Sequence, residues 1–361
     1  RVFGIMGMAD LHGAEDVSWT SLAATAQEGA TAISLQQPVD WRPGERIVIA
    51  STDFDFEQAE ERTITSVSGS TVRFAEPLEH PHWGELLWPG GRRVDERAEV
   101  GLLTRSIIIQ GAADGVAARF GGHTMAMPGS TTRIENVEFY RMGQAGELAR
   151  YPIHWHSAGN RAGSYIRGAA IHHSFSRCVT VHGTNNVLVE DNVAFDTFGH
   201  CYFLEDGAER GNVFEHNLGL VTRRPDEADA LLPSDVNYPG PGTFWITNPD
   251  NTFTNNVAGG SRGVGFWFAL PEHPTGPSAT TSLWPSRTPL EKFDGNTSHS
   301  NGADGLHVDR GPDPSGFTGT TYYDPRLVPA DADSPPVTAR FTGFTAYKNR
   351  NGGAWLRGEN H

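Results

Sequence analysis

A motif that returns along the second half of the chain constrains the fold more than any other feature. Six short segments align on an apolar first residue, and the first two steps between them are 23 and 25 residues. The later steps are longer, and their extra residues fall in stretches rich in proline and glycine, 223–242, 271–290 and 311–337. A period in the twenties with short β-type runs predicts a solenoid that winds one coil per repeat. The segments begin at Ile166, Val189, Phe214, Phe253, Phe293 and Phe341.

The fourth position of the motif is asparagine in four of the six segments. Asparagines stacked at one bend of successive coils can hydrogen-bond to one another and to the backbone of the turn. We therefore predict an all-β chain with a right-handed parallel β-helix at residues 101–361. Residues 1–100 contain short apolar runs between turn formers, which predict a small antiparallel β module packed on the helix. The four asparagines are Asn192, Asn217, Asn256 and Asn296.

A second β-type run follows each motif start by twelve residues, as in Cys178-Val-Thr-Val-His182 and Cys201-Tyr-Phe-Leu-Glu205. Strand side chains alternate between two faces. The second and fourth positions are almost all apolar and should fill the interior, so the third and fifth should point outward. The two cysteines share a column, and a strand spacing of about 4.8 Å would allow a disulfide in an oxidising compartment, although in-register neighbours often have side-chain dihedrals unsuited to bridging.

The third column of these runs is rich in large rings. A soluble protein seldom exposes a row of aromatics unless something binds there, and rings about 4.8 Å apart would suit stacking on successive sugar rings. The alternative is that the loops at 223–242 and 271–290 fold over the rings as a second small core. The predicted sugar-binding row is Phe203, Trp245, Trp267, His307 and Trp355.

The same outward face carries a group of histidines. His154 and His156 would point to one side of their strand, and the next coil would bring His182 alongside. Three imidazoles match the ligand set of zinc or another transition metal. Glu205 on the third coil would be a ligand or a catalytic acid. A metal-free alternative uses histidine as general base and Glu205 as general acid, and the flanking His200 and Asp206 could assist either scheme.

The formal net charge of −15 argues against a nucleic-acid partner, since phosphate binding needs a basic surface. A polysaccharide that carries uronic acids would need positively charged side chains nearby to pair with its carboxylates. Several arginines cluster in sequence around the proposed groove, among them Arg177 and Arg357. The sequence contains no apolar run that approaches the roughly 18 residues needed to span a membrane. We expect a monomer.

Several motifs resemble one known family. They include Tyr151-Pro-Ile-His-Trp-His156, Phe198-Gly-His-Cys-Tyr-Phe-Leu-Glu-Asp-Gly207, Leu232-Pro-Ser-Asp235 and Pro274-Thr-Gly-Pro277. Together they resemble the family of the cell-migration-inducing hyaluronan-depolymerising protein and its transmembrane relative, over nearly the whole chain. The residue composition suggests a microbial member. One departure is the short segment after His156, where Asn160 stands at a position at which the resemblance implies an acidic residue.

The resemblance implies a secreted or cell-surface β-helix that cleaves hyaluronan within the chain and depends on a divalent cation, usually calcium. Imidazoles favour transition metals over calcium, so we expect a transition ion at the histidines and any calcium elsewhere. The leading hypothesis is a glycoside hydrolase acting on hyaluronan or a similar polysaccharide. Two alternatives stay open: a polysaccharide lyase on the same scaffold, and a β-helix that binds glycans without cleaving them.

Overall fold

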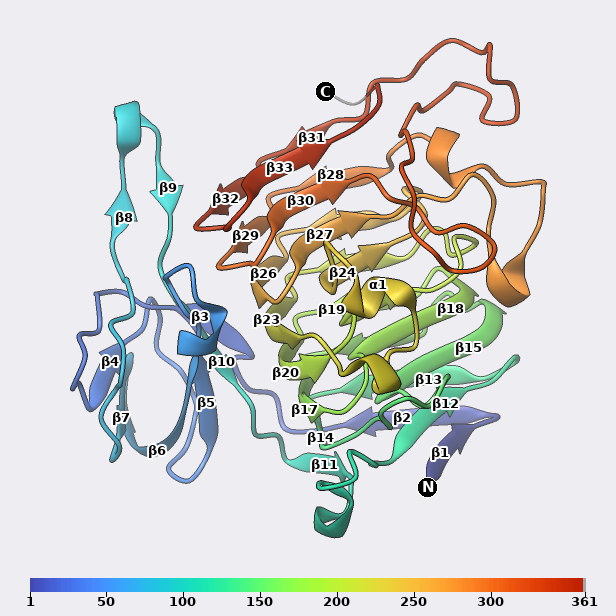
Figure 1. Ribbon diagram of the computed structural model, residues 1–361. Helices are drawn as coiled ribbons and strands as arrows, with labels where there is room; N and C mark the ends of the chain where they lie inside the picture. The colour runs from blue at the N-terminus through green and yellow to red at the C-terminus, as the bar shows by residue number, and fades with distance from the viewer. Residues whose placement is uncertain (360–361) are drawn as a thin grey trace.

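The computed structural model, which describes residues 1–359, confirms the predicted all-β fold (Figure 1). Three parallel sheets run along a solenoid, and each full coil contributes one strand to each sheet. Sheet 1 carries the predicted outward columns. Its strands are β1 (Val2–Ile5), β12 (His123–Ala126), β15 (Ile153–Asn160), β18 (Val179–Asn185), β21 (Tyr202–Leu204), β24 (Gly242–Ile246), β27 (Val264–Phe268), β30 (Asp304–Val308) and β33 (Gly352–Leu356).

The other two sheets complete the coils. Sheet 2 holds the motif starts: β2 (Met8–His12), β13 (Thr131–Glu135), β16 (Tyr165–Arg167), β19 (Leu188–Glu190), β22 (Val213–Glu215), β25 (Thr252–Thr254), β28 (Lys292–Asp294) and β31 (Phe341–Thr342). Sheet 3 consists of β11 (Ile107–Gln110), β14 (Val137–Tyr140), β17 (Ala170–Ser174), β20 (Val193–Phe198), β23 (Leu218–Arg223), β26 (Val257–Ser261), β29 (Thr297–His299) and β32 (Thr345–Tyr347).

The sequence repeat coincides with the register of the sheets. Ile166 pairs with Val189, and the pairing continues through the other four motif starts to Phe341. The asparagine ladder is also confirmed, with amide-to-carbonyl distances of 2.8, 2.9 and 3.0 Å from Asn192 to Asn296. Each asparagine is fully buried, so the ladder satisfies polar groups that water cannot reach.

The N-terminal module begins later than the predicted residues 1–100. The first two strands belong to the solenoid, because β1 pairs with β12 and β2 pairs with β13. The chain then leaves the solenoid, forms the module and returns at β11. The module is a six-stranded antiparallel sheet of β3 (Trp19–Ser21), β10 (Glu99–Leu102), β5 (Arg46–Ile49), β6 (Glu60–Ser68), β7 (Thr71–Phe74) and β4 (Ala32–Ser34), with a hairpin of β8 (Leu86–Leu87) and β9 (Val94–Asp95).

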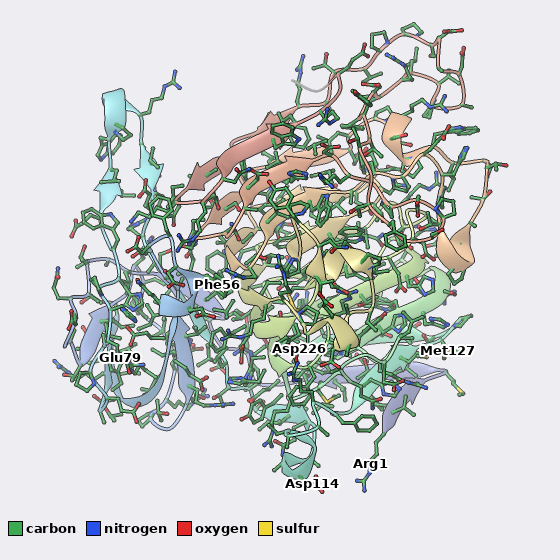
Figure 2. The ribbon with its side chains drawn as sticks, viewed as in Figure 1. Arg1, Phe56, Glu79, Asp114, Met127 and Asp226 are labelled. Atoms are coloured by element: carbon green, nitrogen blue, oxygen red, sulfur yellow. A yellow bond between two sulfur atoms is a disulfide. The ribbon has the colours of Figure 1, made fainter. Side chains whose placement is uncertain are left out.

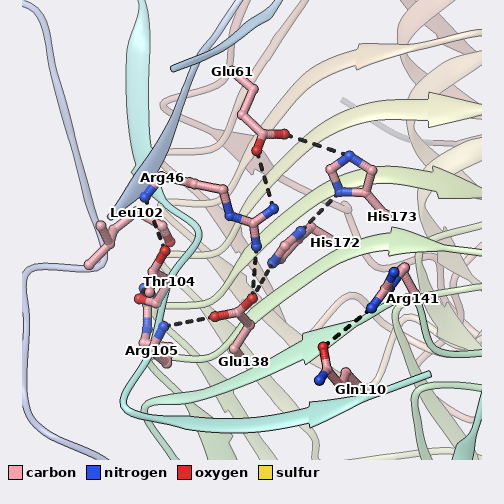
Figure 3. A network of polar contacts seen from close by, with 10 residues as sticks. All are labelled: Arg46, Glu61, Leu102, Thr104, Arg105, Gln110, Glu138, Arg141, His172 and His173. Atoms are coloured by element: carbon pink, nitrogen blue, oxygen red, sulfur yellow. Dashed lines mark hydrogen bonds and ion pairs between the residues drawn. The ribbon is translucent and has the colours of Figure 1, made fainter. Parts of the chain in front are cut away.

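Apolar and polar contacts join the module to sheet 3. Phe56 of the 3₁₀ helix η1 (Phe56–Gln58) packs among Val221 and Val257 at the boundary (Figure 2). Further along the boundary, Arg46 donates to Oε1 of Glu138 at 2.9 Å, and Nε2 of the buried His172 lies 3.1 Å from the same oxygen (Figure 3). The buried carboxylate thus ties the two parts together.

Two further predictions have structural outcomes. Cys178 and Cys201, adjacent in one column, form a disulfide. Among residues 1–359 the structure has no helix long and apolar enough to cross a membrane.

Candidate active site

Three histidines meet on the outer face of sheet 1, where β15 and β18 run side by side. His154 and His156 lie two residues apart, so strand alternation turns both to the same face. His182 is the register partner of His156. The ring of His182 lies 5.0 Å from that of His156 and 5.9 Å from that of His154, centroid to centroid. The predicted convergence of the three imidazoles is therefore present.

The nitrogen atoms of this group are only partly satisfied. Nδ1 of His154 donates to the carbonyl of Ala149 at 3.3 Å, which leaves Nε2 with a free lone pair. That Nε2 is buried and has no hydrogen-bond partner among the described residues. Nδ1 of His156 lies 3.2 Å from Nδ1 of His182. A buried nitrogen without a partner is costly unless a ligand completes it.

Two carboxylates adjoin His182 from the end of β21. Oε2 of Glu205 lies 3.9 Å from Nδ1 of His182 and has no hydrogen-bond partner. Oδ2 of Asp206 lies 2.8 Å from Nε2 on the other side of the ring, at an angle that falls short of a well-aligned hydrogen bond. The fully buried Glu209 accepts the backbone N–H groups of Gly183 and Gly207, each at 2.8 Å, and so fixes the turn to β18.

Burial and charge shift the protonation of these groups. Burial lowers the pKa of His154 well below its ordinary value, and the neighbouring imidazoles act in the same direction. Burial opposes a charge on His182 as well, but Asp206 and Glu205 outweigh it and raise the pKa to about 9. Burial raises the pKa of Glu205 to about 7, against the opposing effect of His182. The two carboxylates therefore favour a positive charge at His182, which a bound cation would supply in place of the proton.

The donor atoms fit a divalent transition metal. One ring nitrogen from each of the three histidines lies within 4.8 Å of the others, and a second group of His182, Glu205 and Asp206 meets the same condition. Ligands at about 2.1 Å around a tetrahedral ion are roughly 3.4 Å apart, close to the observed separation between His156 and His182. The unpartnered Nε2 of His154 supplies the third nitrogen of the first group, and the unpartnered Oε2 of Glu205 belongs to the second.

The predicted row of sugar-stacking rings is wrong for four of its five members, and three of these four lie in one buried cluster. Phe203, Trp245 and Trp267 have at most 1% of their surface exposed and form a second small core, which Leu232 covers. The alternative given by the sequence is therefore the correct one. The insertion after β23 carries helix α1 (Pro233–Val236) and folds back against the solenoid (Figure 1).

Arg177 and His200 belong to this covered cluster and cannot reach a substrate. Both are at most 1% exposed. Arg177 pairs with Asp235 of α1 and lies over the ring of Phe203 at 4.3 Å. His200 contacts the hydroxyl of Ser234 at 2.9 Å, and burial lowers its pKa to about 3. The predicted catalytic role of His200 and the predicted substrate contact of Arg177 are wrong, because both hold the insertion in place.

The other predicted contacts lie further along sheet 1. His307 is also buried, and its Nδ1 contacts Asp304 at 2.8 Å, so it too is unavailable for stacking. Trp355 stays 46% exposed, and its indole N–H donates to Asp309 at 3.0 Å. Arg357 donates to the same carboxylate at 2.8 Å.

The amino-acid sequence matches the CEMIP beta-helix family over residues 119–306, which is more than half of the chain. The chain belongs to this family. It is 36% identical to human fibrocystin-L, with 98% of this chain and 9% of that protein covered. It is 37% identical to the human cell surface hyaluronidase CEMIP2, with 95% and 28% covered. Identity to the mouse cell migration-inducing and hyaluronan-binding protein is also 37%, with 91% and 28% covered. The chain thus spans under a third of each of these relatives.

The structure also shows buried residues around the site that the sequence repeat did not reveal. Glu209 lies in a turn outside the motif, and only its complete burial identifies it. Asp235 lies in a proline-rich insertion where the only signal was the short motif Leu232-Pro-Ser-Asp235. The contact of the 271–290 loop with Asp206 joins segments about seventy residues apart, and sequence spacing carries no signal for it.

Proposed function

We propose that this chain is the glycan-cleaving β-helix of an extracellular protein, and that it hydrolyses hyaluronan or a related uronic-acid polysaccharide within the chain. The observation that carries the proposal is the convergence of His154, His156 and His182, with the unpartnered Oε2 of Glu205 beside His182. Two of the three relatives named above are called a hyaluronidase or a hyaluronan-binding protein. Fibrocystin-L carries no such name, so the proposal depends on the site more than on the family.

Each side chain has a separate role in this proposal. The three histidines would hold a divalent transition ion, which when bound supplies Lewis acidity or a hydroxide at neutral pH. Glu205 would give a proton to the glycosidic oxygen as the bond breaks, and its burial favours the protonated form. The two candidate ion groups share His182, and residues 1–359 offer no separate cluster of three Asp or Glu side chains for the calcium suggested by the resemblance.

The remaining predicted contacts complete the proposal. Trp355 and Arg357 would bind a distant part of the sugar chain by stacking and by pairing with a uronate. The disulfide between Cys178 and Cys201 supports a secreted or cell-surface location, since such bonds persist in oxidising compartments. We propose a monomer that acts on the polysaccharide without nucleic-acid partners.

The test is digestion of hyaluronan, chondroitin and pectin by the purified protein, with chain length and product mass measured. We expect hyaluronan to shorten within the chain and the products to carry one added water. Glu205→Gln should lower the rate by roughly 10²–10⁴-fold. Glu215→Gln, a matched change on sheet 2, should leave it unchanged. Unsaturated products that absorb in the ultraviolet would indicate a lyase instead, and binding without shortening would indicate a glycan-binding protein.

A further inference from the structure

Asp206 is held by a loop that arrives from a later coil. The loop follows β27 and contains the 3₁₀ helix η5 (Gly276–Ser278). The backbone N–H of Ser278 donates to Oδ2 of Asp206 at 3.2 Å. The backbone N–H of Thr275 donates to the Asp206 carbonyl at 2.9 Å. The carboxylate is almost fully buried, so it cannot turn outward to a substrate without breaking these contacts.

The contact between Asp206 and His182 determines where the imidazole carries its proton. A carboxylate oxygen and a nitrogen lone pair repel each other, so the 2.8 Å separation requires a proton on Nε2. Nδ1 is then the atom that an ion would bind, in place of any second proton, and it lies 3.2 Å from Nδ1 of His156. Histidines that bind metals commonly donate their other N–H to a carboxylate or a carbonyl, which fixes the tautomer and the ring orientation. The carbonyl of Ala149 does the same for His154.

Gly276 is the residue that lets the loop approach. Its φ is +56°, and a Cβ built on it would lie 2.6 Å from Oδ1 of Asp206. Any larger residue at this position would therefore push either the loop or the carboxylate away. Gly163 has a similar backbone, with φ of +86°, but a Cβ there would meet no atom within 4 Å. An alanine at either position would strain a left-handed backbone, but only an alanine at 276 would also collide with Asp206. Comparing the two substitutions therefore isolates the effect of the collision.

We propose that Asp206 is a positioning residue that presents Nδ1 of His182 to the metal, and that the η5 loop holds Asp206 in place for this purpose. The inference rests on the proposed metal centre and removes Asp206 from the catalytic acids predicted from the sequence. It couples the ion site to a loop two coils away: disturbing Gly276 should weaken metal binding without touching a ligand.

The experiment measures Zn²⁺ affinity of the whole chain by competition with a chromophoric chelator, for the wild type and four variants. We expect Asp206→Ala to weaken binding by roughly 10–100-fold, the usual effect of removing such a partner. Asp206→Asn keeps an oxygen that can accept from Nε2 and should restore part of the affinity. Gly276→Ala should weaken binding, whereas Gly163→Ala should bind as the wild type does. Circular dichroism and thermal melting check that each variant is folded.

The outcomes separate the two proposals. Wild-type affinity in both Asp206→Ala and Gly276→Ala, with one ion bound to the wild type, would overturn the positioning role and leave the metal centre intact. Equal weakening by Gly163→Ala and Gly276→Ala would also overturn it, because backbone strain alone would then explain the loss. If the wild type binds no Zn²⁺, the metal centre itself fails, and this inference fails with it.

Discussion

The outer face of sheet 1 carries two regions of opposite character, and the predicted outward columns pass through both. At one end, His154 and Glu205 keep buried polar atoms without partners. Further along, Trp245 and Trp267 are sealed, and the charge of Arg177 is paired with Asp235. The difference comes from the insertion after β23, which brings Leu232 and Asp235 onto one region and leaves buried atoms of the other without partners. On a solenoid, strand alternation decides which side chains face outward, but insertions decide which of them are packed and paired.

The comparison is tested most strongly by removing an aromatic from the covered region. Trp267→Ala should lower the free energy of unfolding by about 3–5 kcal/mol, because it leaves a cavity in a closed core. Zn²⁺ affinity of the folded protein should not change. Urea denaturation followed by circular dichroism measures the free energy of unfolding, and chelator competition measures the Zn²⁺ affinity. A variant as stable as the wild type but weaker in sugar binding would mean that the aromatic row is an open groove.

The disulfide joins the coil of His182 to the coil of Phe203, between the two regions. A bond that closes a sequence separation of 23 residues should contribute roughly 3 kcal/mol, mainly by restricting the unfolded chain. Cys178→Ala with Cys201→Ala should therefore lower the midpoint of denaturation and leave ion binding unchanged. Lost Zn²⁺ affinity in the folded double variant would show instead that the bond positions the histidines.

The two regions should respond to pH in opposite directions. Burial lowers the pKa of His200 to about 3 from an ordinary value of 6.5, so its contribution is present above pH 6.5 and is lost as pH falls towards 3. Burial raises the pKa of Glu205 to about 7 from 4.5, so its contribution is present below pH 4.5 and is lost as pH rises through 7. Each group changes stability by up to about 1.4 kcal/mol per pH unit within its window.

Denaturation curves between pH 3 and pH 9 measure how the free energy of unfolding changes with pH on the acid side and on the alkaline side. His200→Gln should reduce the loss of stability on the acid side only. Glu205→Gln should reduce the loss of stability on the alkaline side only. If both variants keep the wild-type pH profile, other groups control the stability of the two regions.

The smallest expected effect is a gain in stability within the site. At pH 8, Glu205→Gln removes a buried charge whose oxygen has no partner, so the free energy of unfolding should rise by about 1 kcal/mol. Glu209→Gln is the matched control, since that carboxylate accepts two backbone N–H groups and its loss should destabilise the protein. A loss of stability in both variants would show that Glu205 is a structural residue like Glu209.

Much of the fold followed from the sequence by itself. The spacing of the motif set the register of sheet 2, and the column from Asn192 to Asn296 set the buried ladder, because identical residues in identical turns stack on one another. Strand alternation also placed His154, His156 and His182 on one face. Relations of this kind depend only on the period of the chain, which can be counted along the sequence.

Other features were decided only by the tertiary structure, because they depend on where long insertions fold. Asp235 lies in the insertion between β23 and β24, yet it pairs with Arg177 of an earlier coil and closes the core over Phe203. The η5 loop reaches back to Asp206 from two coils away. Residues 2–12 join the solenoid rather than the module, because their backbone groups pair with β12 and β13. An insertion does not repeat with the coils, so its position cannot be counted along the sequence. It depends on packing and ion pairs between residues that become neighbours only when the chain folds.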